Sequence, residues 1–118
     1  MVAKPPSKDE VWLVSLDPTV GSEIQKTRPC VIVSPDVMNR HLRTLIIAPM
    51  TGAERPYPTR VPVIFHGKRG QVALDQIRAV DRQRLIRKLG TISSKTVEAV
   101  SSRLVEMFTP PPPPAAAR

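Results

Sequence analysis

The first candidate for chemistry is a polar loop, residues 17–28, that ends in an arginine. Arg28 comes directly before Pro29 and a continuous apolar run, Cys30 to Val33, and the same loop carries the carboxylate of Glu23. A residue before proline is restricted to extended geometry, so we expect Arg28 at the mouth of a buried strand. A charge cannot be buried there without a partner. We therefore expect the guanidinium to face solvent or a ligand.

The rest of the chain offers few other reactive groups. It contains no nucleotide-binding P-loop, no Gly-x-Ser-x-Gly elbow, no His-Glu-x-x-His motif and no cluster of carboxylates typical of a metal site. His41 and His66 lie far apart in polar or basic connections. We interpret His66, beside Lys68 and Arg69, as a solvated turn residue rather than a general base. The sequence therefore predicts chemistry without a metal or a cofactor.

Arginine, hydroxyls and isolated carboxylates suit one reaction in particular. RNA carries its own nucleophile, the 2′-OH beside the scissile phosphate. An enzyme need only align that hydroxyl, stabilise charge on the phosphoryl oxygens and manage two protons. The planar guanidinium of arginine matches a phosphate through two hydrogen bonds. The residue types are therefore compatible with RNA cleavage that uses no covalent enzyme intermediate.

Composition indicates one small domain with a basic surface. The chain has 118 residues, of which 41% are hydrophobic and only 3% aromatic, and the low aromatic content argues against a stacking platform for single strands. The net charge of +8 favours a polyanion or an acidic partner, although a basic surface that serves solubility would look the same. The lone Cys30, with no apolar leader or membrane-length segment, predicts a reduced, cytoplasmic protein without membrane contact.

Short apolar segments separated by proline and glycine predict five strands and one helix. Pro49 is expected to end the third strand and to begin a functional or mobile loop that reaches Pro58. Ser93 is expected to cap the only clear helix, 94–108, whose apolar stripe packs on the sheet or on a second subunit. The predicted fold class is mainly β with a C-terminal α-helix, in a partly closed barrel. The strands are expected at 11–16, 30–34, 42–48, 59–65 and 71–77, with a basic hairpin tip at 66–70.

Four blocks of sequence resemble the MazF/PemK family of toxins from bacterial toxin–antitoxin pairs. This resemblance covers roughly residues 10–108 and implies a single domain there, an SH3-like small barrel (PemK-like) that forms a homodimer. It leaves a flexible arm, 1–9, and a proline-rich disordered tail, 109–118, outside the domain. The blocks are the first strand with the Asp17 to Ser34 stretch, Ile47 to Thr51 with Pro58-Thr59, Val72 to Arg78, and Arg84-Leu85 leading into the last helix.

The resemblance implies a metal-independent, sequence-specific endoribonuclease. Its substrate would be single-stranded RNA, with messenger RNA first and ribosomal or transfer RNA as alternatives. Attack by the 2′-OH would leave a 2′,3′-cyclic phosphate and a 5′-OH. The implied partners are RNA, a cognate antitoxin whose acidic, apolar tail covers the site, and a second copy of the chain. Two alternatives stay open: a toxin of the same fold that poisons DNA gyrase by binding alone, and a catalytically silent RNA-binding relative.

Three residues match catalytic positions of the family. Arg28 matches the arginine of its Arg-Pro block, Thr51 the threonine after the third strand, and Glu23 an acidic position in the arginine's loop. By this resemblance Arg28 would bind the scissile phosphate, Thr51 would hold the 2′-OH or a phosphate oxygen, and Glu23 would act as a base or orient Arg28. A guanidinium hardly deprotonates, so Arg28 is a poor proton donor. The plainer interpretations are a surface ion pair, a turn-capping hydroxyl and a solvated loop carboxylate, respectively.

Other polar residues are expected to support the site or to bind RNA. Gln76, in the shared Asp75-Gln76 block, is expected to hydrogen-bond the backbone of the loop that carries Arg28, a structural role. The loops 17–28 and 50–58 are expected to read the RNA sequence. Five cations are candidates for contacts with the RNA backbone, and each is as easily a solvated charge: Lys26, Arg55, Arg60, Lys68 and Arg69.

Overall fold

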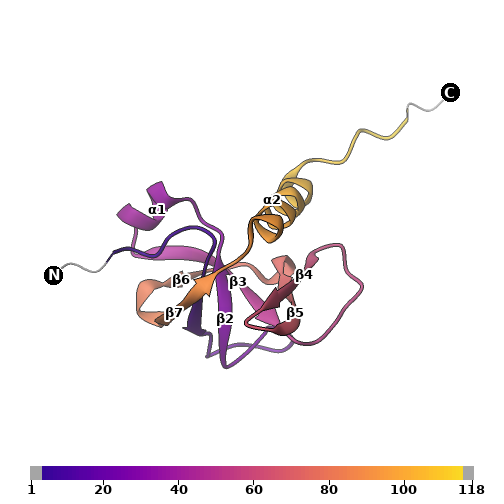
Figure 1. Ribbon diagram of the computed structural model, residues 1–118. Helices are drawn as coiled ribbons and strands as arrows, with labels where there is room; N and C mark the ends of the chain where they lie inside the picture. Colours follow the sequence, from indigo (N-terminus) through magenta and orange to yellow (C-terminus); the bar gives the residue numbers. More distant parts are fainter. Residues whose placement is uncertain (1–3, 116–118) are drawn as a thin grey trace.

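Within the part of the chain that the structure describes, seven antiparallel strands form one curled sheet, and a long C-terminal helix packs against it (Figure 1). The computed structural model describes residues 4–115. The predicted class, mainly β with a C-terminal α-helix, is confirmed. The strands are β1 (Glu10–Ser15), β2 (Thr27–Ile32), β3 (Thr44–Thr51), β4 (Arg60–Phe65), β5 (Lys68–Ala73), β6 (Arg78–Asp81) and β7 (Leu85–Thr91). The helices are α1 (Asp36–His41) and α2 (Ser94–Phe108), with 3₁₀ turns η1 (Leu74–Gln76) and η2 (Arg82–Arg84).

The long strand β3 joins the two halves of the sheet. The strand order is β4-β5-β3-β2-β1-β7, and β6 also pairs with β3. The first part of β3, Thr44 to Ile47, pairs with β6, whereas its last two residues, Met50 and Thr51, pair with β5. Because β3 changes partner along one edge, the hairpin of β4 and β5 can turn away from the rest and leave a hollow at the end of β3.

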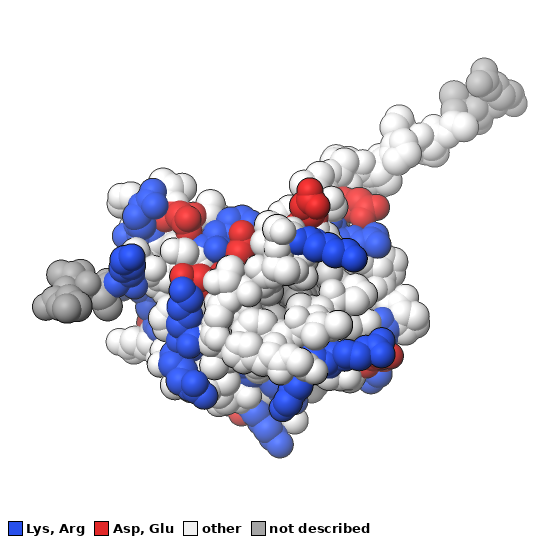
Figure 2. All heavy atoms as spheres, viewed as in Figure 1, with Lys and Arg blue, Asp and Glu red and all other residues white. Residues whose placement is uncertain are grey.

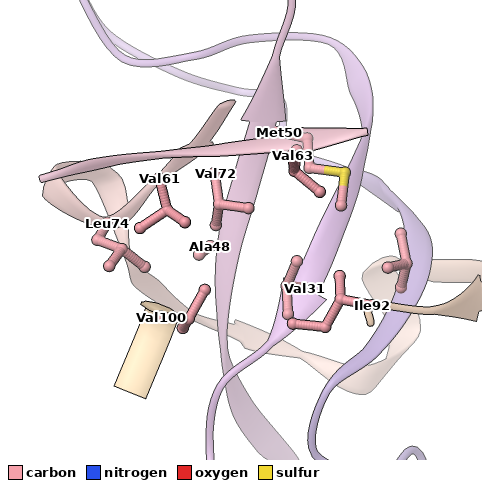
Figure 3. Close-up of a cluster of buried hydrophobic side chains, with 10 residues drawn as sticks. Val31, Ala48, Met50, Val61, Val63, Val72, Leu74, Ile92 and Val100 are labelled. Atoms are coloured by element: carbon pink, nitrogen blue, oxygen red, sulfur yellow. The ribbon is translucent and has the colours of Figure 1, made fainter. Parts of the chain in front are cut away.

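Two apolar clusters fill the two faces of the sheet. Successive side chains of β2 belong alternately to one cluster and to the other, since side chains along a strand point to opposite faces. Val31 belongs to the cluster under α2, which also contains Val100 of that helix, and Cys30 and Ile32 belong to the other (Figure 3). Burial raises the pKa of the Cys30 thiol to about 12, so it behaves as a small apolar side chain. As predicted, β2 is buried on both faces, which makes it a rigid support for Arg28.

The structure corrects several predicted strand boundaries. Pro49 does not end the third strand, because β3 runs on to Thr51. Pro49 lies between the residues of β3 that pair with β6 and those that pair with β5, where its missing N–H costs no ladder bond. The predicted fifth strand, 71–77, begins earlier, at Lys68, and gives way to a 3₁₀ turn at Leu74. The predicted five strands were too few, because β6 and β7 were missed.

Local helix signals were read correctly. The helix α2 spans the predicted 94–108, and the Ser93 side chain accepts a hydrogen bond from Thr96 N. Its stripe is only partly buried: Val100 is buried in the core, whereas Val105 and Phe108 are 67% and 69% exposed. No helix among the described residues is both long and apolar enough to cross a bilayer.

The two chain ends differ in how they attach to the sheet. Residues 7–9 of the predicted arm are tied down: Asp9 N donates to Ile32 O at 2.8 Å, and Lys8 N donates to Asp36 Oδ1 at 2.7 Å. The arm is therefore shorter than the predicted 1–9, whose first three residues lie outside the described residues. Beyond α2, residues 110–115 run away from the sheet without regular structure (Figure 1). The last three residues of the predicted tail, 116–118, are also outside the described part.

Candidate functional site

Arg28 and Thr51 line one groove, of about 490 Å³. Arg28 is the second residue of β2, and Thr51 is the last residue of β3. The two strands pair with Cys30 opposite Pro49. If that register is continued by two residues, Arg28 falls opposite Thr51, at the point where the strands separate. Pairing of neighbouring strands thus brings together two residues that lie far apart in the chain.

The opposite wall of the groove comes from the β4–β5 hairpin. Met50 and Val63 contribute apolar lining to the groove. Both also belong to the core cluster under α2, which Figure 3 shows. The charged or titratable side chains that line it are Arg28, His66, Lys68 and Arg69. No carboxylate is among the described residues that line this groove. An anion such as a phosphodiester would therefore meet attraction without competition from an internal acid.

The guanidinium of Arg28 is anchored at one nitrogen only. Its Nε donates to the carbonyl oxygen of Gln25 at 3.1 Å. Within residues 4–115 no carboxylate oxygen lies within 4 Å of it, so the plainer interpretation of a surface ion pair does not hold. Its terminal amino groups make no hydrogen bond to the described residues. They remain available for the two parallel bonds that a phosphate accepts.

The hydroxyl of Thr51 caps a turn but keeps its proton for another acceptor. Thr51 Oγ1 accepts a hydrogen bond from Ala53 N at 3.2 Å, which is the turn-capping role considered above. The β5 backbone passes very close here: a β-carbon at Gly70 would lie 2.8 Å from the Thr51 carbonyl oxygen. Gly70 is thus needed to form the groove beside Thr51. The sequence pattern placed Gly70 at the end of the predicted hairpin tip 66–70, whereas it lies inside β5, and its close approach to Thr51 was not predicted.

Glu23 is not brought to the groove. It lines a second hollow, of about 390 Å³, together with Ser22, Ile24, Asp75, Gln76 and Arg78. Its Oε1 accepts a hydrogen bond from Val20 N at 2.6 Å, so the carboxylate closes its own loop. No ion pair joins Glu23 to Arg28 within the described chain. The structure therefore argues against Glu23 as the residue that orients Arg28, a position taken by the Gln25 carbonyl.

Gln76 holds the loop in the second hollow. Its Oε1 accepts from Ile24 N at 2.6 Å, and its Nε2 donates to Ser22 O at 3.3 Å. These bonds join η1 to a loop more than 50 residues earlier in the chain. They are the backbone contacts expected from the sequence, made from a 3₁₀ turn rather than from the end of a strand.

The five predicted RNA-binding cations divide into three groups. Lys68 and Arg69 line the groove, and Arg69 makes only a loose, exposed contact with Glu54, at 3.9 Å. Lys26 and Arg55 are exposed but do not line the groove. Figure 2 shows Lys and Arg side chains around a largely uncharged central area of one face, with few acidic residues.

Arg60 has a structural partner instead. Its Nε donates to Asp75 Oδ1 at 2.7 Å and its Nη2 to Oδ2 at 3.1 Å, and its side chain is only 8% exposed. This bond raises the pKa of Arg60 and lowers the pKa of Asp75. We no longer expect Arg60 to bind RNA, since a phosphate would have to displace a two-bond carboxylate.

Two further arginines, missed in the sequence, fix the start of the 17–27 loop. Arg78 Nη1 donates to Leu16 O at 3.1 Å, and Arg84 Nη1 donates to Asp17 O at 2.7 Å. Nothing local in the sequence marks them, because their acceptors are carbonyls more than 60 residues away.

A small curled sheet, with an arginine and a hydroxyl in a groove that no carboxylate of the described residues lines, defines a small β-barrel protein suited to a phosphodiester chain. The chain belongs to the PemK-like, MazF-like toxins of type II toxin–antitoxin systems, whose family model matches residues 7–108. The resemblance noted in the sequence is thereby confirmed.

Relatives and solved structures agree with this assignment. Endoribonuclease PemK of Escherichia coli is 35% identical over 108 residues, covering 86% of this chain and 81% of that protein. Endoribonuclease MazF of Staphylococcus saprophyticus is 33% identical over 103 residues, covering 82% and 86%. The crystal structure of MazF from Deinococcus radiodurans matches with a TM-score of 0.79 at 24% identity, over 90% of this chain and 98% of that one. A mycobacterial endoribonuclease in complex with its cognate antitoxin matches with a TM-score of 0.76 at 24% identity, over 91% and 99%.

Proposed function

We propose that this chain is an endoribonuclease toxin that cuts single-stranded RNA without a metal ion. The observation that carries the proposal is the convergence of Arg28 and Thr51, from different strands, on one groove that is lined by no carboxylate of residues 4–115. Relatives that are 33% and 35% identical over most of the chain are named endoribonucleases, which supports the same activity.

In the proposed reaction the scissile phosphate binds in the groove against Arg28. The two terminal amino groups of Arg28 donate to the phosphoryl oxygens and stabilise the charge that grows on them in the transition state. The Thr51 hydroxyl donates a hydrogen bond to the 2′-oxygen or to a phosphate oxygen on the same side of the phosphorus. The 2′-OH gives its proton to water as its oxygen attacks phosphorus, and the bond from phosphorus to the 5′-oxygen breaks. The 5′-oxygen takes up a proton, and the products are a 2′,3′-cyclic phosphate and a 5′-OH.

The substrate strand would be held and read by different parts of the surface. Lys68 and Arg69 attract the backbone beside the scissile phosphate, while Lys26 and Arg55 extend the positive surface beyond the groove. The exposed loops 17–26 and 52–59 flank the groove residues in the chain and are the proposed readers of bases, since single-stranded bases offer their edges to side chains.

Two protein partners belong to the proposal. One is an antitoxin, as in the mycobacterial complex. An acidic segment of the antitoxin of this chain would occupy the cationic groove and exclude RNA. The other is a second copy of this chain. Val105 and Phe108 on α2 are largely exposed in the single chain, and a dimer would cover such apolar side chains.

The test is incubation of the purified chain with long RNA in EDTA, followed by mapping of the new ends. We expect discrete cuts whose downstream products carry a 5′-OH and whose upstream products carry a cyclic phosphate. Intact RNA would overturn the proposal. Intact RNA together with stalled DNA gyrase complexes would identify the gyrase poison, whereas RNA that is bound but uncut would identify the silent relative.

A further inference from the structure

His66 lies in the same groove as Arg28 and Thr51, at the turn between β4 and β5. The other charged groups that face this groove are Arg28 from β2, and Lys68 and Arg69 from β5. A guanidinium does not give up its proton, and a lysine does so only far above neutral pH. Imidazole is the side chain that gains and loses a proton near neutrality. The groove thus holds one group suited to proton transfer, and the proposed reaction must move two protons.

The ring of His66 is held in place, but its nitrogens are unused. It stacks on Phe65, with ring centroids 4.0 Å apart and planes 19° from parallel. The bare backbone of Gly90 leaves room for this pair, because a β-carbon there would lie 3.1 Å from Phe65 Cζ and 3.5 Å from His66 Nε2. Neither ring nitrogen hydrogen-bonds to any of residues 4–115. By contrast, His41 Nδ1 lies 2.8 Å from the carbonyl oxygen of Val37 in α1.

The turn between β4 and β5 holds His66 in a left-handed conformation. His66 has φ 50° and the next residue, Gly67, has φ 76°. Two successive left-handed residues form the tight hairpin turn that asparagine, aspartate or glycine fills best. Histidine is, with asparagine and aspartate, among the non-glycine residues enriched in this conformation, so the turn accepts His66 without strain. The turn thus presents the imidazole beside a stacking phenylalanine and a cationic groove.

The length of β5 separates His66 from Thr51 along the groove. Thr51 pairs with Gln71 of β5, whereas His66 precedes Lys68, the residue at the other end of that strand. The His66 ring lies next to Gly90 of β7. In an in-line displacement the attacking and leaving oxygens stand on opposite sides of phosphorus. If Thr51 holds the 2′-oxygen, this separation leaves His66 free to serve the leaving 5′-oxygen.

We propose that His66 is the general acid of the cleavage reaction, an inference that rests on the proposed function. As the bond from the 2′-oxygen to phosphorus forms, the bond from phosphorus to the 5′-oxygen breaks and its electron pair stays on the 5′-oxygen. The imidazolium of His66 donates its proton to that oxygen and leaves neutral imidazole. The proton of the 2′-OH passes to water, and His66 regains a proton from water before the next turnover.

The test combines a matched pair of variants with a substrate whose leaving group needs no acid. His66→Asn and His41→Asn are compared with the wild type in single-turnover cleavage, in EDTA, over a series of pH values. One RNA has the natural linkage at a cleavage site mapped with the wild type, and the other has sulfur in place of its 5′-oxygen. A thiolate leaves phosphorus without protonation.

We expect His66→Asn to cleave the natural RNA about 100-fold more slowly and the sulfur-linked RNA at the wild-type rate. The dependence of the wild-type rate on pH that a general acid causes should be lost in this variant. His41→Asn should match the wild type on both substrates. An equal loss on both RNAs, which indicates a role in binding or folding, would overturn the proposal, as would wild-type rates on both.

These outcomes separate the two proposals. If the wild type cuts neither RNA, the endoribonuclease proposal fails and the role of His66 fails with it. If the wild type cuts the natural RNA but the sulfur substitution does not restore the rate of His66→Asn, only the proposed role of His66 fails.

Discussion

Two hollows in this small sheet differ in what their polar groups already do. In the second hollow, residues 22–24 and 75–78, Gln76 bonds the loop backbone, Glu23 bonds Val20 N, and Asp75 holds Arg60. In the groove, Arg28 uses one nitrogen, and His66 uses neither among the described residues. The polar groups of the second hollow therefore hold the loop in place, whereas nitrogens of Arg28 and His66 in the groove remain available to a ligand.

The comparison teaches how to sort charged residues on a basic protein. Arg60 and Arg69 both looked like RNA contacts in the sequence, but Arg60 makes two short bonds to Asp75 whereas Arg69 meets Glu54 only at 3.9 Å in solvent. An exposed pair of that length contributes almost nothing to stability, so Arg69 is easily recruited by a phosphate. The partners of a charge, rather than its type, decide its role.

Replacing Arg28 should have the largest effect on activity. Arg28→Ala is expected to slow RNA cleavage by about 10²–10³-fold or more, because it removes the donors aimed at the phosphoryl oxygens. Arg28→Lys should recover only part of this, since an ammonium lacks the two-bond fork. Single-turnover cleavage in EDTA measures the effect, with circular dichroism to check the fold. A folded Arg28→Ala variant that cuts at the wild-type rate would remove the groove from the mechanism.

Removing the charges of Lys68 and Arg69 in the groove should weaken RNA binding equally for all RNA sequences. For Lys68→Gln/Arg69→Gln we expect the slope of log affinity against log salt to flatten by roughly 1.4, at about 0.7 for each lost phosphate contact. Binding is measured with RNAs that carry 2′-deoxyribose at the cleavage site, so that they stay intact. Arg40→Gln, on α1 outside both hollows, is the matched control and should leave the slope unchanged. An unchanged slope in the double variant would show that both residues are solvated charges that do not contact the RNA backbone.

The sequence predicted those elements whose signals are local. The strand after Arg28 was marked by a proline and an apolar run, and α2 was marked by Ser93 and its apolar stripe. β6 and β7 were missed because β6 is only four residues long and β7 is largely polar, and both depend on pairing with distant strands. A pattern along the chain does not report such pairing.

The candidate site was predictable only in part, for a related reason. The pairing of Arg28 with Thr51 came from a family resemblance, and the register of β2 and β3 gives its physical basis. Asp75, the partner of Arg60, is 15 residues away, so the sequence offered both charges without showing that they meet. His66 reads as a turn residue until the stack on Phe65 and the shared groove are seen.

Removing the hydrogen bonds of Gln76 should lower the stability of the fold. Gln76→Ala removes two hydrogen bonds and leaves the Ile24 amide without its acceptor, so we expect the free energy of unfolding to fall by about 1–3 kcal/mol. Thermal denaturation should show a melting temperature lower by about 4 °C for each kcal/mol. Gln76→Glu keeps the acceptor and should lose less. Equal melting temperatures for Gln76→Ala and the wild type would show that the loop needs no such support.

The Asp75–Arg60 pair should make stability depend on pH. Because Arg60 lowers the pKa of Asp75, the folded state gains stability only while the carboxylate is ionised. Asp75→Asn should reduce the free energy of unfolding by about 1–2 kcal/mol at pH 7. That difference should shrink as the pH falls below the ordinary aspartate value of about 4 and disappear below the lowered pKa. Urea unfolding from pH 7 to pH 2 measures it, and Glu54→Gln should show no such difference.

Replacing Glu23 should have the smallest effect on RNA cleavage. This substitution also tests most directly whether the second hollow is structural and the groove catalytic. Its carboxylate bonds Val20 N and lines the second hollow, so Glu23→Gln should change the rate of RNA cleavage by no more than about twofold, as for an exposed substitution. Glu98→Gln on α2 is the matched control. If Glu23→Gln instead loses about 100-fold, as removal of a general base would, the loop must carry this carboxylate into the groove when RNA binds. The satisfied polar groups of the second hollow would then be a resting state, and the role suggested by the family resemblance would stand.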